Sequence, residues 1–577
     1  MWWSRYVSGN LSVLLFGVFL FLFWFFLSLV SKGVVVYMSW ELFNVGVGVM
    51  EFNLVFDWVS LSFGCVVVLI SACVLMFACE YMVEDIFLSR FSWLVFLFVL
   101  SMNFVIFIPN LVSILLGWDG LGLVSFLLVI YYQNYKSLAG GMITVLMNRI
   151  GDVAILLSIG LVCKEGTWGF FYFSFSDDLK LVCLFLLVAG MTKSAQVPFS
   201  SWLPAAMAAP TPVSALVHSS TLVTAGVFPL IRFYSFLSQV WWFQVALLII
   251  ASMTMLMAGI AANVETDLKK IIALSTLSQL GVMMGSLGIG AWELALFHLY
   301  THALFKALLF LCAGVFIHRS QHGQDLRMSG MVWNRLPVIV SCIHVSNLSL
   351  CGAPFLAGFY SKDLILESSF YGGFSFLILF MFFFATGLTV SYSFRFSYFV
   401  LWGSYNFYSM SNWKDELVVE VFPALVLVFG AVVGGSFFSW VLFYGEGVVF
   451  LSFLDKIFTL MVVMVGVLVG WFVVGMSSFV SLKDSFFGSK TYFGFIYMWF
   501  LTYLSGQGVI KSTIRSGSSM LYQVDRGWLE VLGGEGSLMF VKDMVVRAQG
   551  YNYNSVLVYL SLMIFVVGVS GILLIVF

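Results

Sequence analysis

The sequence is poor in charge. Lys and Arg number 26 and Asp and Glu number 27 among 577 residues, so only 9% of the chain is charged and the formal net charge is −1. Soluble domains carry roughly a quarter of their residues as charges, and proteins that bind nucleic acid have basic tracts that this chain lacks. The composition therefore excludes a water-soluble globular protein. It predicts partners within a membrane and no nucleic-acid partner.

Cysteine, histidine and proline are also scarce, at eight, six and nine residues. The cysteines lie mostly in apolar stretches and none forms a CxxC pair, which argues against disulfides, zinc and iron–sulfur clusters. His318 and His322 have the spacing of metal ligands, but they fall at an expected helix end beside Arg319. Because nucleotide, flavin and haem motifs are missing too, we expect no cofactor and no metal in this chain.

Apolar residues make up 62% of the chain. Apolar windows of about twenty residues, each long enough to cross a bilayer, predict an all-α polytopic membrane protein with about 15 transmembrane helices. The windows are 11–30, 58–79, 91–108, 111–131, 142–163, 181–209, 212–236, 244–262, 270–289, 294–317, 336–369, 373–402, 418–443, 456–478 and 556–577.

Two of these windows contain helix-breaking residues. Window 181–209 contains Pro198 and Pro204, and window 336–369 contains Gly352, Pro354 and Gly358. Each window also carries a lysine beside its break, Lys193 in the first and Lys362 in the second. A matched pair of interrupted, charged helices is typical of transporters built from inverted repeats.

Two other segments have a different pattern. Residues 32–57 alternate enough to predict a short hairpin at the membrane surface. Residues 500–550 mix charged and apolar side chains before the last window, which favours a helix lying along the membrane or along neighbouring subunits, interrupted near Gly533 and Gly534. An exposed polar loop is the alternative for this second segment.

The helix expected around 294–317 carries His298, His302 and Lys306 at steps of four residues. Such steps turn by about 40° and rise about 6 Å, so the three side chains line one face of the helix. A charge in mid-membrane costs roughly 2.5 to 3.5 kcal/mol on the insertion scale, so groups of this kind mark a function unless partners explain them. We interpret the stripe as a path for protons.

Other ionisable residues fall inside the expected spans. Asp119 is the only charge in its window and Lys193 is its natural counter-ion, either as a pair that takes up and releases a proton or as a static ion pair. His218 could relay between Lys193 and the stripe, although a lone buried histidine is usually structural. Lys362 and Asp363 suit the exit end of such a path or a helix end at the interface.

Five further charged residues have simpler interpretations. Arg149 and Asp152, three residues apart, are expected to compensate each other. Asp267, Lys269 and Lys270 lie at an expected helix start and are expected to anchor it at the interface.

Four motifs together resemble one family. The stretches 117–122 (GWDGLG), 193–198 (KSAQVP), 209–218 (APTPVSALVH) and 302–310 (HALFKALLF) resemble chain 5 of NADH:ubiquinone oxidoreductase, respiratory complex I. The resemblance runs from about residue 50 to 400 and more loosely to the C-terminus. The same motifs occur in cation/proton antiporters, so the family is called antiporter-like.

The resemblance implies a proton-translocating membrane-arm subunit of the mitochondrial inner membrane, encoded in the mitochondrion and driven by quinone reduction elsewhere in the complex. It implies proton transfer through the residues Asp119, Lys193, His218, His298, His302, Lys306, Lys362 and Asp363. NADH, FMN, iron–sulfur clusters and ubiquinone would belong to other subunits, and the partners would be membrane-arm and accessory subunits, lipids and protons.

The implied organisation has five parts. They are N-terminal spans and a surface hairpin (1–90), two inverted five-helix repeats (91–236 and 244–402), additional spans (403–480), and a lateral helix with a terminal anchor (481–577). The family usually has sixteen spans, one more than the windows predict here. It also commonly has Glu where this chain has Asp119, which leaves a shorter side chain to approach Lys193.

Two other functions remain open from the sequence. The chain could be a subunit of a sodium/proton antiporter, which would require a sodium gradient rather than NADH. It could instead be a structural clamp whose ion pairs carry no protons, in which case substitutions at Lys193 and Lys306 would leave pumping intact.

Overall fold

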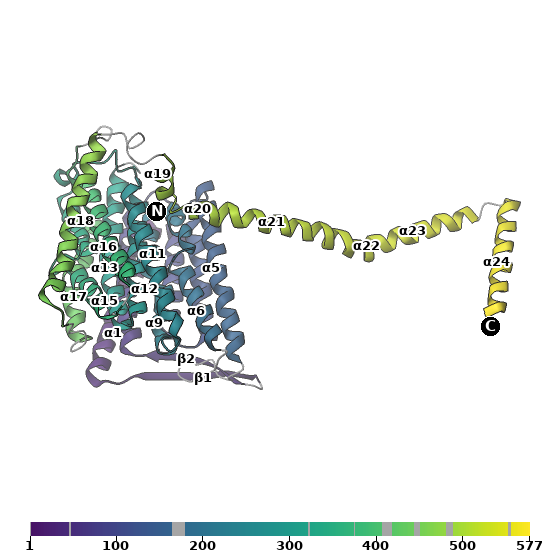
Figure 1. Cartoon of the computed structure of the whole chain (residues 1–577), viewed down its shortest axis with the longest axis horizontal. Coiled ribbons are helices and arrows are strands. Elements are labelled where there is room, and N and C mark those ends of the chain that lie inside the picture. The colour runs from purple at the N-terminus through teal and green to yellow at the C-terminus, as the bar shows by residue number, and fades with distance from the viewer. Residues whose placement is uncertain are drawn as a thin grey trace. The chain divides into compact units, whose positions relative to one another are not determined.

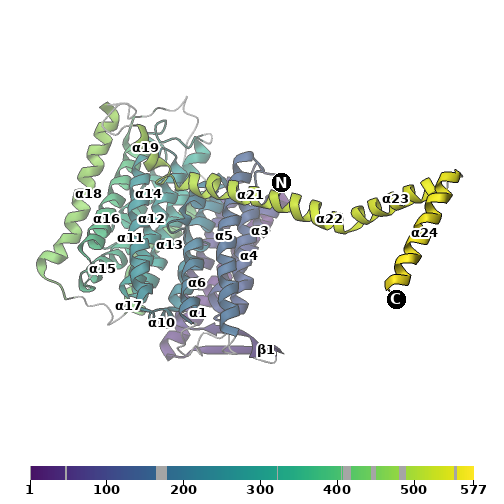
Figure 2. The same cartoon turned by 45° about the vertical axis from the view of Figure 1, so that its right-hand side comes forward.

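The computed structural model describes residues 2–45, 48–163, 179–320, 323–373, 375–404, 406, 418–443, 450–479, 489–551 and 555–576. The chain divides into two compact units, 1–502 and 503–577, which are described separately. The first unit is a bundle of helices with one hairpin (Figures 1 and 2).

Among the described residues, 13 helical segments are long and apolar enough to cross a membrane. Those in the first unit are α1 (Trp2–Lys32), α2 (Trp58–Tyr81), α3 (Leu88–Phe107), α4 (Leu111–Val129), α5 (Tyr135–Val162), the run α8 (Thr211–Val213), η5 (Ser214–Thr221) and α9 (Thr224–Arg232), α11 (Trp241–Val264), α12 (Leu268–Ile289), α13 (Trp292–Arg319), α16 (Phe376–Ser397) with η7 (Tyr398–Trp402), α17 (Val418–Val441) and α18 (Phe453–Phe479). Each of them falls on one predicted window.

The two remaining windows contain the predicted broken helices. The first holds α6 (Leu179–Lys193), which is followed by the short turns η3 (Phe199–Ser201), α7 (Trp202–Ala205) and η4 (Ala206–Ala208). The second holds α14 (Pro337–Cys351) and α15 (Ala357–Tyr371). The prediction of two interrupted helices is therefore confirmed.

Glycine sets the geometry of the second break. Gly352 caps α14 with a φ of +84°, a conformation in which a side chain is strained. Gly358 packs so closely on the end of α14 that a Cβ there would lie 1.8 Å from the Ser349 carbonyl oxygen. The two half-helices can therefore approach each other only because this position has no side chain.

The most deeply buried helices form the centre of the bundle. The spanning windows of α12, of α13 and of the segment Thr211–Arg232 are completely buried, whereas only 17% of the window of α1 and 22% of that of α18 are buried. Figures 1 and 2 both show α12 and α13 inside the bundle. Since α13 carries the predicted stripe, the structure places those ionisable groups where lipid cannot reach them.

The predicted hairpin is confirmed. Strands β1 (Val36–Val45) and β2 (Gly48–Phe56) pair antiparallel, with Val36 opposite Phe56, and lie across one end of the bundle (Figure 1). Asp57 then starts α2 through a capping box with Ser60.

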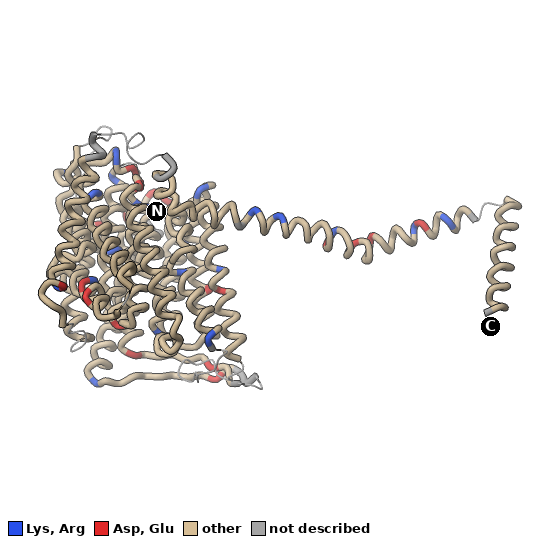
Figure 3. The backbone as a smooth tube through the Cα atoms, in the orientation of Figure 1, with Lys and Arg blue, Asp and Glu red and all other residues tan. Residues whose placement is uncertain are grey.

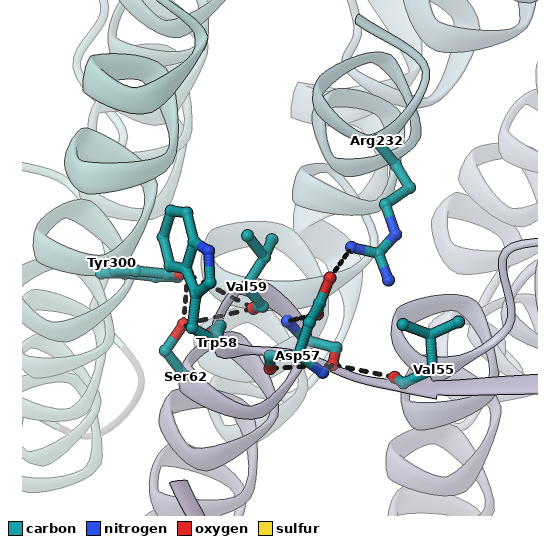
Figure 4. A network of polar contacts seen from close by, with 8 residues as sticks. Val55, Asp57, Trp58, Val59, Ser62, Arg232 and Tyr300 are labelled. Atoms are coloured by element: carbon teal, nitrogen blue, oxygen red, sulfur yellow. Dashed lines mark hydrogen bonds and ion pairs between the residues drawn. The ribbon is translucent and has the colours of Figure 1, made fainter. Parts of the chain in front are cut away.

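A polar network ties this end of α2 to two other helices (Figure 4). Arg232, in the last turn of α9, pairs with the Asp57 carboxylate at 2.5 Å. Ser62, one turn into α2, contacts the hydroxyl of Tyr300 on α13 at 2.5 Å. The network therefore fixes α2, α9 and α13 relative to one another beneath the hairpin.

Short helices complete the first unit. They are α10 (Tyr234–Leu237), η6 (Val332–Asn334), α19 (Ser489–Ile496) and α20 (Leu501–Tyr503), the last of which meets the unit boundary.

The described residues of the second unit are helical except at Gly533 and Ser555. It contains η8 (Leu504–Gly508), α21 (Val509–Met520), η9 (Leu521–Trp528), α22 (Leu529–Leu532), α23 (Gly534–Tyr551) and α24 (Val556–Val576). The predicted interruption is confirmed, because α22 ends at Leu532 and α23 begins at Gly534. Lys, Arg, Asp and Glu are spaced between α21 and α23 (Figure 3). The predicted helix is confirmed over this segment, and the alternative, an exposed polar loop, is wrong.

Candidate functional site

Lys193 ends α6 with a fully buried side chain. Its Nζ donates a hydrogen bond to the backbone carbonyl of Trp118 on α4 at 2.7 Å and lies 3.7 Å from the centre of the Trp118 ring. The indole Nε1 of Trp118 donates in turn to Asp152 Oδ1 on α5 at 2.9 Å. The ammonium group therefore lies against a tryptophan whose indole N–H holds a carboxylate. The contacts of the ammonium with the carbonyl and with the ring both favour the charged lysine.

The predicted counter-ion, Asp119, occupies a different place. Its carboxylate lies 3.8 Å from Arg149 Nη1, and 37% of its side chain is exposed. Arg149 also pairs with Asp152 at 3.1 Å, as predicted from their spacing. Among the ion pairs of the described residues none joins Asp119 to Lys193, although the charges of Asp152 and Asp119 both act on the lysine, that of Asp152 more strongly.

Asp152 contacts more than the Arg149 side chain that its sequence spacing predicts. Its side chain is only 10% exposed and it links the exposed Arg149 to the buried Trp118. A buried carboxylate requires a cation or donors to offset lost hydration, and Asp152 has both. The spacing from Arg149 was visible in the sequence, but its contact with Trp118 depends on the packing of α4 against α5.

His218 lies in η5, a stretch with π-helical hydrogen bonding, and is buried. Neither ring nitrogen has a hydrogen-bond partner among the described residues. Its ring centre is 6.1 Å from that of Trp202, whose Nε1 donates to the carbonyl of Thr192 at 3.0 Å. Trp202 thus lies between His218 and the residue preceding Lys193, a neighbour that the sequence did not reveal.

His298, His302 and Lys306 lie on α13 and are all buried, as predicted. The two imidazole centres are 6.2 Å apart. His298 Nδ1 lies 2.9 Å from the Ser361 hydroxyl, and its Nε2 lies 3.2 Å from Gln279 Oε1. His302 has no hydrogen-bond partner on either nitrogen within the described part of the chain, and Lys306 Nζ donates to Ser275 Oγ at 2.6 Å.

The second helix break brings Lys362 close to the stripe of ionisable residues on α13. Lys362 is buried on α15 and donates to the Leu350 carbonyl at the end of α14 at 3.3 Å and to Thr389 Oγ1 on α16 at 2.9 Å. The preceding residue, Ser361, contacts His298. Asp363 is half-buried on the same helix.

A second charged position differs from the prediction. Lys269 was expected to anchor a helix start at the interface, but its side chain is buried and Nζ donates to the carbonyl of Ala209 at 3.1 Å. Its neighbour Lys270 pairs with Glu265 and Asp267 at the helix start, as an anchor should. The helical turn explains why Lys269 is buried and Lys270 is not, because adjacent residues on a helix face directions about 100° apart.

The residues described contain no cluster of three or more His, Cys, Asp or Glu that could hold a metal ion. The distance between His318 and His322 cannot be checked against the spacing of metal ligands, because His322 lies outside the described residues. Within that range, His318 Nδ1 lies 3.9 Å from Glu420.

The arrangement can hold and move protons in short steps. Lys193, His218, His298, His302, Lys306 and Lys362 are buried basic groups, and hydroxyl or carbonyl groups contact four of them. The hydrogen bonds do not join Lys193 to His218 or His218 to α13 directly, so transfer between these parts requires water or side-chain movement.

Family models match nearly the whole chain. Residues 109–389 match the model described as NADH:quinone oxidoreductase/Mrp antiporter, transmembrane. Residues 40–92 match the complex I chain 5 N-terminus, and residues 392–575 match the NADH dehydrogenase subunit 5 C-terminus.

Individual relatives agree. NADH-ubiquinone oxidoreductase chain 5 of the mosquito Anopheles quadrimaculatus is 47% identical over 553 residues, 95% of each chain. That of the earthworm Lumbricus terrestris is 49% identical over 501 residues, covering 86% of this chain and 87% of the relative.

A solved structure, the Mrp complex from a Dietzia species, has a similar fold. The TM-score is 0.74 at 24% identity, over 94% of this chain and 62% of that one. The present chain thus spans about three fifths of the chain that it matches in that complex.

The two broken helices and the buried basic stripe define a membrane protein of the antiporter-like class. Within that class, the chain belongs to the NADH-ubiquinone oxidoreductase chain 5 family.

Proposed function

We propose that this chain translocates protons as a membrane-arm subunit of NADH:ubiquinone oxidoreductase, driven by quinone reduction in other subunits. It is a multi-pass protein of the mitochondrial inner membrane. NADH, FMN, iron–sulfur clusters and ubiquinone bind to other subunits of the complex. Membrane-arm and accessory subunits and lipids are its partners, and the second unit of the chain braces the neighbouring subunits.

One observation carries the proposal. Three ionisable side chains, His298, His302 and Lys306, lie fully buried on one face of the central helix α13. Groups of this kind are costly to bury and are retained in membranes chiefly for proton or ion transfer. The route proposed for the protons comprises Asp119, Lys193, His218, His298, His302, Lys306, Lys362 and Asp363.

The contacts of Lys193 supply a switch. Its proton is held by the Trp118 carbonyl and ring and by the nearby charge of Asp152. Moving the carboxylate away from the lysine lowers the affinity of the lysine for its proton, and moving it closer raises that affinity. A change in the Arg149–Asp152–Asp119 cluster would therefore release a proton toward His218.

The energy for transport comes from outside the chain. Moving one charge against a membrane potential costs about 2.3 kcal/mol per 100 mV. The two helix breaks, one in each proposed repeat (91–236 and 244–402), expose backbone groups that water can hydrate. Water at these breaks gives protons access to Lys193 and Lys362.

The test is NADH-driven proton uptake in membrane vesicles that contain the assembled complex. With Lys306→Ala, proton uptake per NADH falls while the abundance of the complex is unchanged. Lys136→Ala, at an exposed position on α5, is the control. Wild-type proton uptake with Lys306→Ala contradicts the route, and uptake that requires a sodium gradient without NADH supports a sodium/proton antiporter instead.

A further inference from the structure

His298 is the one imidazole of the stripe with a side-chain partner on each ring nitrogen. Ser361 lies 2.9 Å from Nδ1 and Gln279 Oε1 lies 3.2 Å from Nε2. All three residues are fully or almost fully buried. The contacts come from three different helices, α12, α13 and α15, so they fix the ring on both edges.

The chemistry of these partners assigns the hydrogens. An amide oxygen only accepts, so Gln279 Oε1 requires a hydrogen on Nε2. A neutral imidazole has a single N–H, which leaves Nδ1 as the acceptor for the Ser361 hydroxyl. Nδ1 is therefore the nitrogen that can gain a second proton.

Thr301 completes a reversible hydrogen-bond chain around Nδ1. Its hydroxyl lies 2.9 Å from Ser361 Oγ and 3.1 Å from the carbonyl oxygen of His298. With neutral His298, Thr301 donates to Ser361 and Ser361 donates to Nδ1. With protonated His298, Nδ1 donates to Ser361, Ser361 donates to Thr301, and Thr301 donates to the carbonyl.

Both protonation states thus keep Nδ1 and the two hydroxyls bonded, with only the hydroxyl hydrogens turning. Nε2 donates to Gln279 in both states. Such an arrangement avoids the cost of about 1 to 3 kcal/mol that an unsatisfied buried polar group carries.

From this geometry we propose that Ser361 carries the proton to and from His298 at Nδ1 and that Gln279 is a positioning residue that holds the hydrogen on Nε2. The inference rests on the proposed function and deepens it. A proton delivered by water or by the Lys362 ammonium through water binds Ser361 Oγ, and the hydroxyl hydrogen of Ser361 moves to Nδ1. The serine is restored and the positive charge resides on the imidazolium.

The position of Ser361 determines the side from which His298 exchanges protons. Ser361 precedes Lys362 on α15, so His298 exchanges protons with the side of the second broken helix. His302, whose nitrogens have no partner among the described residues, has no equivalent arrangement.

Four variants test this proposal in vesicles with the assembled complex, measured as proton uptake per NADH oxidised. Ser361→Ala removes the transfer hydroxyl, and Ser361→Thr keeps one. Ser278→Ala removes a buried hydroxyl from the residue before Gln279; this hydroxyl contacts Tyr392 at 3.1 Å and is not a partner of His298. Gln279→Met removes the acceptor for Nε2 with a side chain of similar length.

We expect Ser361→Ala to slow transfer at His298 by about 100-fold, within the range found for lost proton-transfer groups, so that the proton yield falls. Ser361→Thr restores the yield, Gln279→Met lowers it, and Ser278→Ala leaves it unchanged. A wild-type yield with Ser361→Ala overturns the assignment to Ser361, and a wild-type yield with Gln279→Met overturns that to Gln279. An equal loss with Ser361→Thr and Ser278→Ala overturns the proposal in favour of general packing damage.

The parent function fails in a different way. If Lys306→Ala also pumps normally, the whole proton route is wrong. If Lys306→Ala loses pumping while Ser361→Ala and Gln279→Met do not, only the mechanism at His298 is wrong.

Discussion

Lys193 donates its hydrogen bond to the carbonyl of Trp118, 2.7 Å away, and its ammonium group lies over the ring of the same residue. The neighbouring Asp119 instead approaches Arg149. The carboxylate that shares Trp118 with Lys193 is Asp152. Trp118 thus links the first basic group of the proposed route to a buried carboxylate.

Asp152→Asn is expected to lower proton uptake per NADH more than Asp119→Asn does. Asp152 is the more deeply buried carboxylate and contacts both Arg149 and Trp118, so its charge acts on Lys193 through a medium that screens it less. The measurement is the initial rate of NADH-driven proton uptake at equal complex abundance. A larger loss with Asp119→Asn would contradict this ordering.

Trp118→Phe keeps a ring over Lys193 and removes the indole N–H that holds Asp152. A hydrogen bond to a charged group contributes about 1.5 to 3 kcal/mol, so we expect proton transfer from Lys193 to change roughly tenfold or more in rate. Trp241→Phe, on an exposed indole at the start of α11, is the matched control. Equal pumping rates in the two variants would show that the Asp152 contact is unimportant.

Arg232→Met should weaken the end of the bundle beneath the hairpin (Figure 4). The side chains of Arg232 and Asp57 are 11% and 16% exposed, and leaving a buried carboxylate unpaired costs about 3 to 5 kcal/mol. The thermal midpoint for dissociation of the assembled complex should fall.

The control for that experiment is Arg327→Met. Arg327 pairs with Asp325 at 2.6 Å, but its side chain is 72% exposed, and exposed pairs contribute about 0 to 1 kcal/mol. The Arg327 guanidinium, which donates hydrogen bonds to Asp325, holds the pKa of that carboxyl below its usual value. Equal midpoints for the two variants would contradict a structural role of the Asp57–Arg232 pair.

Gly358→Ala should prevent normal packing of the second broken helix. The added Cβ would meet the Ser349 carbonyl oxygen at 1.8 Å, so α14 and α15 would have to separate. We expect a strong loss of assembled complex on native gels. Gly122→Ala on α4 places its Cβ in open space and is expected to assemble normally; normal assembly of both variants would be evidence against the close approach.

Sequence patterns predicted the helical windows, the two breaks and the hairpin because each depends on local chemistry. Apolar length defines a span, Pro198 and Gly352 interrupt helices, and steps of four place His298, His302 and Lys306 on one face. The stripe therefore needed no knowledge of neighbouring helices.

The partners of these groups could not be predicted in the same way. Ser361 and Gln279 are far from His298 in sequence, and ordinary hydroxyl and amide residues give no signal until the helices pack. The same holds for Trp118, whose indole contacts Asp152 on α5 and Lys193 on α6. The sequence pairs Asp119 with Lys193 because Asp119 is the only charge in its window. In the structure, the position of Asp119 on α4 directs its carboxylate to Arg149 instead.

If buried charges in this chain carry protons, replacing Lys193 must stop the pumping. The measurement is NADH-driven proton uptake by vesicles containing the assembled complex with Lys193→Ala, compared with wild type at equal abundance and equal quinone reduction. The account predicts that proton uptake linked to quinone reduction collapses while assembly survives. Unchanged uptake would contradict it and leave the chain a structural subunit.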